Sequence, residues 1–174
     1  MKKYAYFPGC SLKKMALSYH VSIIETTQKL GVELKELDDW NCCGATAYFH
    51  LDELLAYTLC ARNLAMAEKL KLDLVAPCAA CFKNHYFANT QLKSDPDLAD
   101  HINFALEEDN LKFNGSIGVR HLLEVFVQDV GLDEVRAKVT DPLNGLRVAT
   151  YYGCQILRPR ISLRICCLPS AQNR

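Results

Sequence analysis

Short apolar segments followed closely by cysteine recur along this chain, and they limit its fold more than any other feature. Four such segments have the length and β-prone composition of strands: 4–8 before Cys10, 32–37 before Cys42 and Cys43, 72–76 before Cys78, and 146–151 before Cys154. Longer amphipathic segments separate them. This alternation predicts an α/β fold, with a mainly parallel sheet flanked by helices. In such sheets the carboxyl ends of the strands share one edge, so we expect the cysteines to converge there.

Five segments are predicted to be helical from their spacing of apolar residues. They are 14–30, 52–71, 78–91, 96–108 and 118–130. Gly31 is a typical residue just past a helix end. Pro96 stands where a proline in the first helical turn is tolerated.

Composition restricts the class of protein and its partners. Hydrophobic residues make up 50% and charged residues 23% of the chain, as in a soluble protein with a core, which excludes intrinsic disorder. Twenty Lys and Arg balance twenty Asp and Glu, so we expect no nucleic-acid partner. We find neither a signal peptide nor an apolar run that would span a bilayer, and we expect a cytoplasmic protein. In that reducing compartment, clustered cysteines more often bind metal or carry out redox chemistry than form bridges.

The spacing of five cysteines gives the main chemical signal. Cys10 is followed after thirty-one residues by Cys42-Cys43-Gly44, and after thirty-three more by Cys78-Ala79-Ala80-Cys81. Cys78 and Cys81 fall on one face at the start of a predicted helix, where free backbone N–H groups stabilise thiolates. Gly44 and Gly9 have no Cβ atom, so backbone can approach an inorganic core closely.

Four interpretations of these cysteines remain open from spacing alone. An iron–sulfur centre can use all five, including the adjacent pair. A single zinc ion takes four ligands, commonly from two short chelating pairs, and only one such pair is present. A thioredoxin-like dithiol explains Cys78 and Cys81 and leaves the other three unexplained. Plain core thiols are the fourth interpretation.

The three-part pattern resembles the cysteine-rich CCG domain found in the B subunit of heterodisulfide reductase, over about residues 1–159. It consists of Pro8-Gly9-Cys10, Cys42-Cys43-Gly44 and Pro77-Cys78-Ala79-Ala80-Cys81. Similar domains occur in iron–sulfur subunits of succinate, glycolate, lactate and glycerol-3-phosphate oxidoreductases. The resemblance implies a noncubane [4Fe-4S] cluster, with Cys10, Cys42, Cys43, Cys78 and Cys81 as its ligands.

The same resemblance implies partners and a substrate. In the family, flavin- and ferredoxin-type iron–sulfur subunits deliver electrons, and the disulfide of coenzyme M and coenzyme B, a substrate of methanogenesis, is cleaved. Two alternatives remain. One is an electron relay in a quinone-linked succinate, glycolate or lactate dehydrogenase, and the other is a zinc-stabilised or metal-free interaction module without activity.

The family carries two such domains in tandem, and the C-terminal part departs from that pattern. Cys154 resembles the first ligand of a second cluster, yet Cys166 and Cys167 come too soon after it and no second C-x-x-C follows. We therefore expect a cysteine-rich domain over 1–145, the start of a truncated second repeat over 146–159, and an atypical, disordered tail over 160–174. This truncation makes activity of the chain alone doubtful.

Side chains near the five cysteines receive simpler assignments. Lys13 and Lys14 are candidates to attract an acidic substrate, although solvated charge is the commoner role of such residues. Cys60 is predicted to be a core residue in the middle of a helix. His85 is expected to be partly exposed, with a proton donor as the alternative. Trp40 is expected to shield the site by packing.

Overall fold

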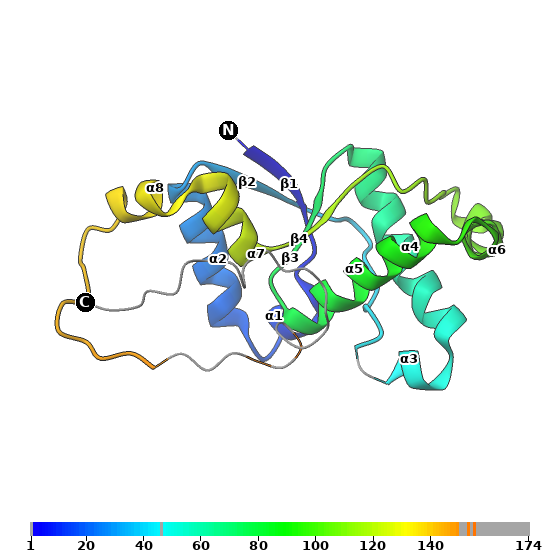
Figure 1. Ribbon diagram of the computed structural model, residues 1–174, viewed down its shortest axis with the longest axis horizontal. Helices are drawn as coiled ribbons and strands as arrows, with labels where there is room; N and C mark the ends of the chain where they lie inside the picture. The colour runs from blue at the N-terminus through cyan, green and yellow to red at the C-terminus, as the bar shows by residue number, and fades with distance from the viewer. Residues whose placement is uncertain (1, 46, 150–152, 154, 156–174) are drawn as a thin grey trace.

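The computed structural model describes residues 2–45, 47–149, 153 and 155, and its centre is a four-stranded sheet (Figure 1). All neighbouring strands pair in parallel, in the order β2-β1-β3-β4. The strands are β1 (Lys2–Tyr6), β2 (Val32–Glu36), β3 (Leu74–Ala76) and β4 (Val119–His121). The predicted α/β class with a parallel sheet is thus confirmed. β1 lies between β2 and β3, so the chain changes direction across the sheet at β1, the kind of place where such folds bind ligands.

Helices connect the strands and cover both faces of the sheet (Figure 1). Asp52 and Asp95 cap two of them, since their carboxylates accept the backbone N–H groups of Leu55 and Leu98. The helices are α1 (Gly9–Leu12), α2 (Leu17–Lys29), α3 (Tyr48–Leu51), α4 (Glu53–Leu70), α5 (Ala79–Ser94), α6 (Pro96–Leu106), α7 (Leu122–Glu124) and α8 (Leu132–Ala137), with a 3₁₀ turn η1 (Glu107–Asp109) and a π-helical turn η2 (Val125–Val130).

Alternating side chains of β1 and of Phe7, the residue that follows it, pack into two hydrophobic clusters, one on each face of the sheet. Ala5 and Phe7 pack with small residues of α4 and with α5, whereas Tyr4 and Tyr6 pack with α2 and the segment after β4. This follows from the period of two along a strand. Cys78, at the carboxyl end of β3, contacts both clusters.

Two predicted elements were wrong. The segment 118–130, predicted as one helix, begins with β4, whose Val119 pairs with Leu74 of the neighbouring strand; helix begins only at Leu122. Its apolar residues satisfy a buried strand as well as a helix, and pairing with β3 decides between them. The predicted strand 146–151 is irregular over residues 146–149, and its last two residues lie outside the described part.

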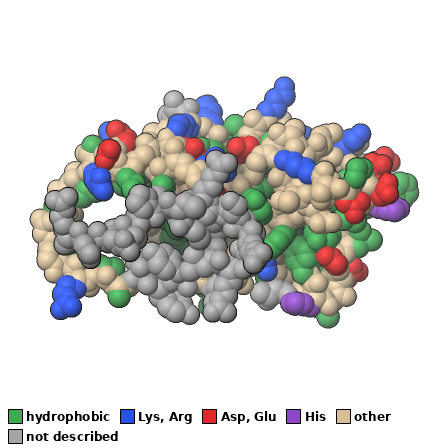
Figure 2. All heavy atoms as spheres, in the orientation of Figure 1, with side chains coloured by type: hydrophobic (Ala, Val, Ile, Leu, Met, Phe, Trp, Pro, Cys, Tyr) green, Lys and Arg blue, Asp and Glu red, His purple; other side chains and the backbone are tan. Residues whose placement is uncertain are grey.

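Within the part of the chain that the structure describes, every helix is too short or too polar to cross a bilayer. On the face drawn in Figure 2, acidic and basic side chains of the described residues are intermingled, in line with the balanced composition.

Candidate metal centre

The five predicted cysteines come together at the carboxyl edge of the sheet. Cys10 lies in α1 after β1, the adjacent pair lies in the irregular segment after β2, and Cys78 and Cys81 begin α5 after β3. Because the three strands are parallel neighbours, these segments meet at one edge.

The thiols form a continuous row. The Cys10 thiol lies beside that of Cys42, whose neighbour in sequence is Cys43. The Sγ atoms of Cys43 and Cys81 are 3.4 Å apart, and the Cys81 thiol also interacts with that of Cys78. All five are free thiols. Cys43 and Cys81 in the middle of the row are buried, Cys78 at one end is half-buried, and Cys10 and Cys42 at the other end are exposed, so the site is open to solvent at that end.

Local hydrogen bonds favour the thiolate at two of these positions. The hydrogen bond with the Cys81 thiol lowers the pKa of Cys78 to about 5, against the opposing effect of burial, and backbone N–H groups of Cys81 and Ala80 contribute. Those N–H groups belong to the first turn of α5, whose donors have no partner within the helix. The hydrogen bond between the Cys43 and Cys81 thiols lowers the pKa of Cys43 to about 7. The same two hydrogen bonds, with Cys43 and then Cys78, raise the pKa of Cys81.

Glycine is required where the backbone approaches the sulfurs. Gly9 has a φ of +70°, and a Cβ atom built there would lie 2.9 Å from the Sγ atom of Cys81. Gly44, directly after the cysteine pair, has a φ of +78°. Both positions disfavour any residue with a side chain. The backbone and the thiols together thus form a close-fitting cradle of soft sulfur donors, the donor type that iron–sulfur clusters and zinc use.

The thiols do not surround a single point. Among the residues that the structure describes, no three His, Cys, Asp or Glu side chains are already arranged to hold one metal ion. Cys154, the expected first ligand of a second cluster, lies outside the described residues, as do Cys166 and Cys167.

The histidine nearest the thiols differs from its prediction. His85 is fully buried instead of partly exposed, because α5 turns this side chain between Phe7 and α4. Its Nδ1 atom lies 2.8 Å from the carbonyl oxygen of Cys81, and its Nε2 atom lies 3.1 Å from the Nδ2 atom of Asn63. Burial lowers the pKa of His85 to about 4, so the ring is neutral at physiological pH and is not an acid there.

Three other nearby side chains follow or refine their predictions. Cys60 is fully buried in the core, as predicted, with its thiol 3.6 Å from the carbonyl oxygen of Cys43. Trp40 packs edge-on against Phe7 beside the site, as expected for a shielding residue. Lys13 forms an ion pair with Glu36 at 2.7 Å, so much of its charge is compensated.

The buried amides of Asn84 and Asn63 lie beside the thiols and were not predicted from the sequence. Asn84 donates hydrogen bonds to the backbone around Cys43, and Asn63 bonds to the backbone of Asn41. Asn84 stands three residues after Cys81, on the same helical face, and this spacing could have placed it beside the cysteines.

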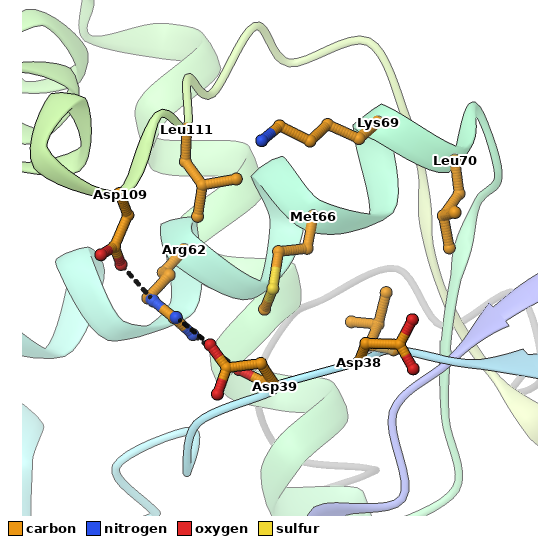
Figure 3. A pocket seen from close by; sticks show the side chains of 9 residues that line it. Asp38, Asp39, Arg62, Met66, Lys69, Leu70, Asp109 and Leu111 are labelled. Carbon is orange, nitrogen blue, oxygen red and sulfur yellow. Dashed lines mark hydrogen bonds and ion pairs between the residues drawn. The ribbon is translucent and has the colours of Figure 1, made fainter.

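An arginine also holds the segment that leads to the cysteine pair (Figure 3). Arg62 of α4 donates to the carboxylates of Asp39 and Asp109 at 2.6 and 2.7 Å, and to the carbonyl oxygen of Asp39. These groups line a surface pocket of about 360 Å³, into which Met66 and Lys69 also point. None of the five cysteines lines this pocket.

Comparison with known proteins agrees with this site. Residues 4–84, which include all five cysteines, match the CCG cysteine-rich domain family. This match agrees with the resemblance that the cysteine motifs indicated.

The relatives are subunits of redox enzymes. The chain is 38% identical over 162 residues to the 8-methylmenaquinol:fumarate reductase membrane anchor subunit of Wolinella succinogenes, covering 93% of this chain and 56% of that protein. It is 29% identical over 160 residues to the B subunit of the ferredoxin/F420H2-dependent CoB-CoM heterodisulfide reductase of Methanosarcina acetivorans, covering 91% and 53%. The chain thus spans little more than half the length of these relatives.

A solved structure supports the fold alone. The crystal structure of a hypothetical protein from Helicobacter pylori superposes with a TM-score of 0.64 at 21% identity, over 71% of this chain and 24% of that one.

Proposed function

We propose that this chain is an iron–sulfur subunit of a redox complex, and that Cys10, Cys42, Cys43, Cys78 and Cys81 hold a noncubane [4Fe-4S] cluster. The observation that carries the proposal is the row of five free thiols from three remote segments, brought together at one sheet edge. Two of them, Cys78 and Cys43, have lowered pKa values, and thiolates are the form in which cysteine binds metal.

The number of thiols favours a cluster over the alternatives. One zinc ion takes four ligands around a point, which leaves a fifth thiol unused. A catalytic dithiol needs only Cys78 and Cys81. A core with several irons could take all five sulfurs, because adjacent cysteines would then bind different irons.

For the reaction we propose reductive cleavage of a disulfide of the coenzyme M–coenzyme B type. A disulfide takes up two electrons and two protons and gives two thiols, and the bond between its sulfurs breaks. When bound, the cluster supplies the electrons singly. Flavin- and ferredoxin-type partner subunits are their proposed source.

The chain's own residues indicate where the substrate binds and where its protons come from. Cys10 and Cys42 form the exposed end of the row, so we place the substrate there. The neutral, buried His85 does not donate a proton at physiological pH, so the two protons come from solvent at the open end. Lys14 is exposed in the turn after α1 and is the remaining candidate to attract an acidic substrate.

A second candidate function is an electron relay to or from a quinone-linked enzyme. The observation in its favour is the 38% identity to a subunit of a menaquinol:fumarate reductase, against 29% to a heterodisulfide reductase subunit. In that case the five cysteines would hold a cluster that would relay electrons between partners, and the exposed end of the row would bind no disulfide. Oxidation of the reduced protein by a mixed disulfide, against reduction by a menaquinol analogue, separates the two functions.

Anaerobic reconstitution with iron and sulfide tests the ligand assignment. We expect Cys43→Ser to lower bound iron and acid-labile sulfide about tenfold, because it removes a buried thiolate at the centre of the row. Cys60→Ser is the matched control, since Cys60 is also a buried cysteine of the same core and lies outside the row.

Equal iron in the two variants would defeat the assignment. One zinc per chain without sulfide would instead favour the zinc-stabilised module.

A further inference from the structure

The segment that carries the cysteine pair is held by one side chain of α5. The Nδ2 atom of Asn84 lies 3.0 Å from the carbonyl oxygen of Cys43 and 2.6 Å from that of Ala45. It also lies 3.9 Å from the Sγ atom of Cys43, within the range of an N–H···S hydrogen bond. Asn84 is fully buried, and its contacts with the carbonyl oxygen and the sulfur of Cys43 are buried as well, so water competes little for them.

The backbone at this point needs such support. Gly44 and Ala45 have φ angles of +78° and +42°, and the second of these is unfavourable for a residue with a side chain. A turn of this kind persists only where surrounding contacts hold it. The amide group of Asn84 meets the carbonyl groups on both sides of Gly44, so it fixes the turn directly.

A second tie holds the other side of the pair. Asn63 accepts a hydrogen bond from the backbone N–H of Asn41 at 3.1 Å and donates one to its carbonyl oxygen at 3.0 Å. The same Asn63 amide lies next to His85, which bonds to the carbonyl oxygen of Cys81. The pair is therefore fixed after it directly to α5, the helix that carries Cys81, and before it to α4, whose Asn63 contacts His85 of α5.

From these contacts we propose that Asn84 is a positioning residue that sets the sulfur of Cys43 against that of Cys81 and donates an N–H group to it. Its effect on the thiols stands on the contacts above, and its effect on a cluster rests on the proposed function. Donor groups aimed at a ligand sulfur tune the potential of a cluster, so Asn84 acts there through Cys43.

The test uses the whole chain, metal-free and fully reduced. Diamide oxidises two neighbouring thiols to a disulfide and is itself reduced to a hydrazine, and peptide mass spectrometry then gives the ratio of Cys43–Cys81 to Cys78–Cys81 linkages. We expect Asn84→Asp to lower this ratio about tenfold, the effect of losing one hydrogen bond of ordinary strength. The carboxylate keeps the shape of the amide and places oxygen against two carbonyl oxygens.

Asn89→Asp is the matched control. Asn89 is also a buried asparagine of α5, and its Nδ2 atom donates to the carbonyl oxygen of Ile117 at 3.2 Å, at the far end of the helix from the thiols. We expect this variant to keep the wild-type ratio. A general loosening of the fold would lower the long-range Cys43–Cys81 linkage in both variants, so a fall confined to the Asn84 variant is specific to its contacts.

Asn84→Ala is the second variant, in case the buried carboxylate prevents folding. It removes the donor without adding charge, and we expect the same fall in the ratio. A ratio within twofold of wild type in a folded Asn84 variant overturns the proposal.

The reconstituted protein gives an independent readout. We expect the midpoint potential of the cluster to shift in Asn84→Ala and not in Asn89→Ala, and equal potentials overturn the role towards the cluster. If neither the wild-type chain nor any variant takes up iron and sulfide, the proposed function fails. The linkage ratio alone then still decides whether Asn84 positions the thiols.

Discussion

Gly9 shows at the scale of single residues how little space the backbone leaves around the sulfurs. Its φ of +70° and the 2.9 Å between a Cβ atom built there and the sulfur of Cys81 are two separate obstacles to any side chain. The chain offers a comparison, because Gly31 has a φ of +69° and nothing within 4 Å of the same position.

We expect Gly9→Ala to destabilise the metal-free protein more than Gly31→Ala does. Both variants carry the cost of a left-handed backbone, about 1–2 kcal/mol. Only Gly9→Ala adds a clash with a buried thiol, so Cys81 must move. Urea unfolding measures the free energy of unfolding of each variant, and alkylation of Cys81 reports its displacement. Equal losses of stability with unchanged alkylation would contradict the close approach.

The residues that sequence reasoning identified are those whose chemistry shows in their spacing. Cysteines repeated after predicted strands had to meet at one edge if the sheet was parallel, and Gly9 and Gly44 stood next to them. Asn84 and Asn63 were missed because an asparagine is usually exposed. The spacing from Cys81 places Asn84 on the cysteine face of its helix, but only the packing of α4 and α5 shows that both amides are buried. His85 was expected to be partly exposed, because histidine is intermediate in its usual burial and the sequence does not show how α5 packs.

At the scale of elements, α5 links the Cys78–Cys81 turn to the segment that carries Cys42 and Cys43. It carries Cys81 and His85 on its buried face and packs against both α4 and the sheet. His85 keeps its neutral form there, with a pKa lowered to about 4 by burial from an ordinary value of 6.5. Below about pH 6.5 the unfolded chain therefore binds a proton that the folded chain does not bind until about pH 4.

From this difference we expect acid to destabilise the fold partly through His85. Stability is lost as the pH falls from about 6.5 towards 4, by up to about 1.4 kcal/mol per pH unit. His85→Gln removes this contribution, so its free energy of unfolding should depend less steeply on pH in that interval.

The exposed His101 provides the control, as His101→Gln. Urea titrations between pH 4 and 7 compare the two variants, in which the carboxylates contribute equally. The same slope in both would mean that His85 is not the group responsible.

Element prediction succeeded where periodicity and end signals agreed. The segment 52–71 forms α4 with Asp52 as its cap, and Pro96 begins α6 as expected. β4 was missed because a strand of three residues has too few positions to show alternation. Its identity comes from pairing with β3, which is far away in the sequence.

At the scale of the whole molecule, the cysteines and the core occupy different lengths of chain. The family match ends at residue 84, and all five thiols lie before it. The cluster of buried side chains around α4 and α5 continues beyond it, with Leu92, Ile102, Leu106, Phe113 and Val119. The cysteine-bearing residues 4–84 thus depend for their packing on buried side chains that follow them in the chain.

We therefore expect residues 1–145 to fold as a domain and residues 1–84 not to. The shorter chain loses β4 and buried apolar side chains that each contribute about 1.5–3 kcal/mol. Circular dichroism during urea unfolding should show a cooperative transition for 1–145, close to that of the full chain, and none for 1–84. A cooperative transition for 1–84 would contradict this dependence, and loss of folding in 1–145 would contradict the proposed domain boundary.

The three cysteine segments are held in unequal ways, and this sets an order of assembly. Cys10 and the Cys78–Cys81 turn sit in helices that begin within a few residues of the two central strands, so they take their places as the sheet forms. The adjacent pair sits on irregular backbone, fastened mainly by amide and arginine side chains. These fastenings can open while the sheet stays intact, so under the proposed function we expect this pair to be the last of the three segments to close around a cluster.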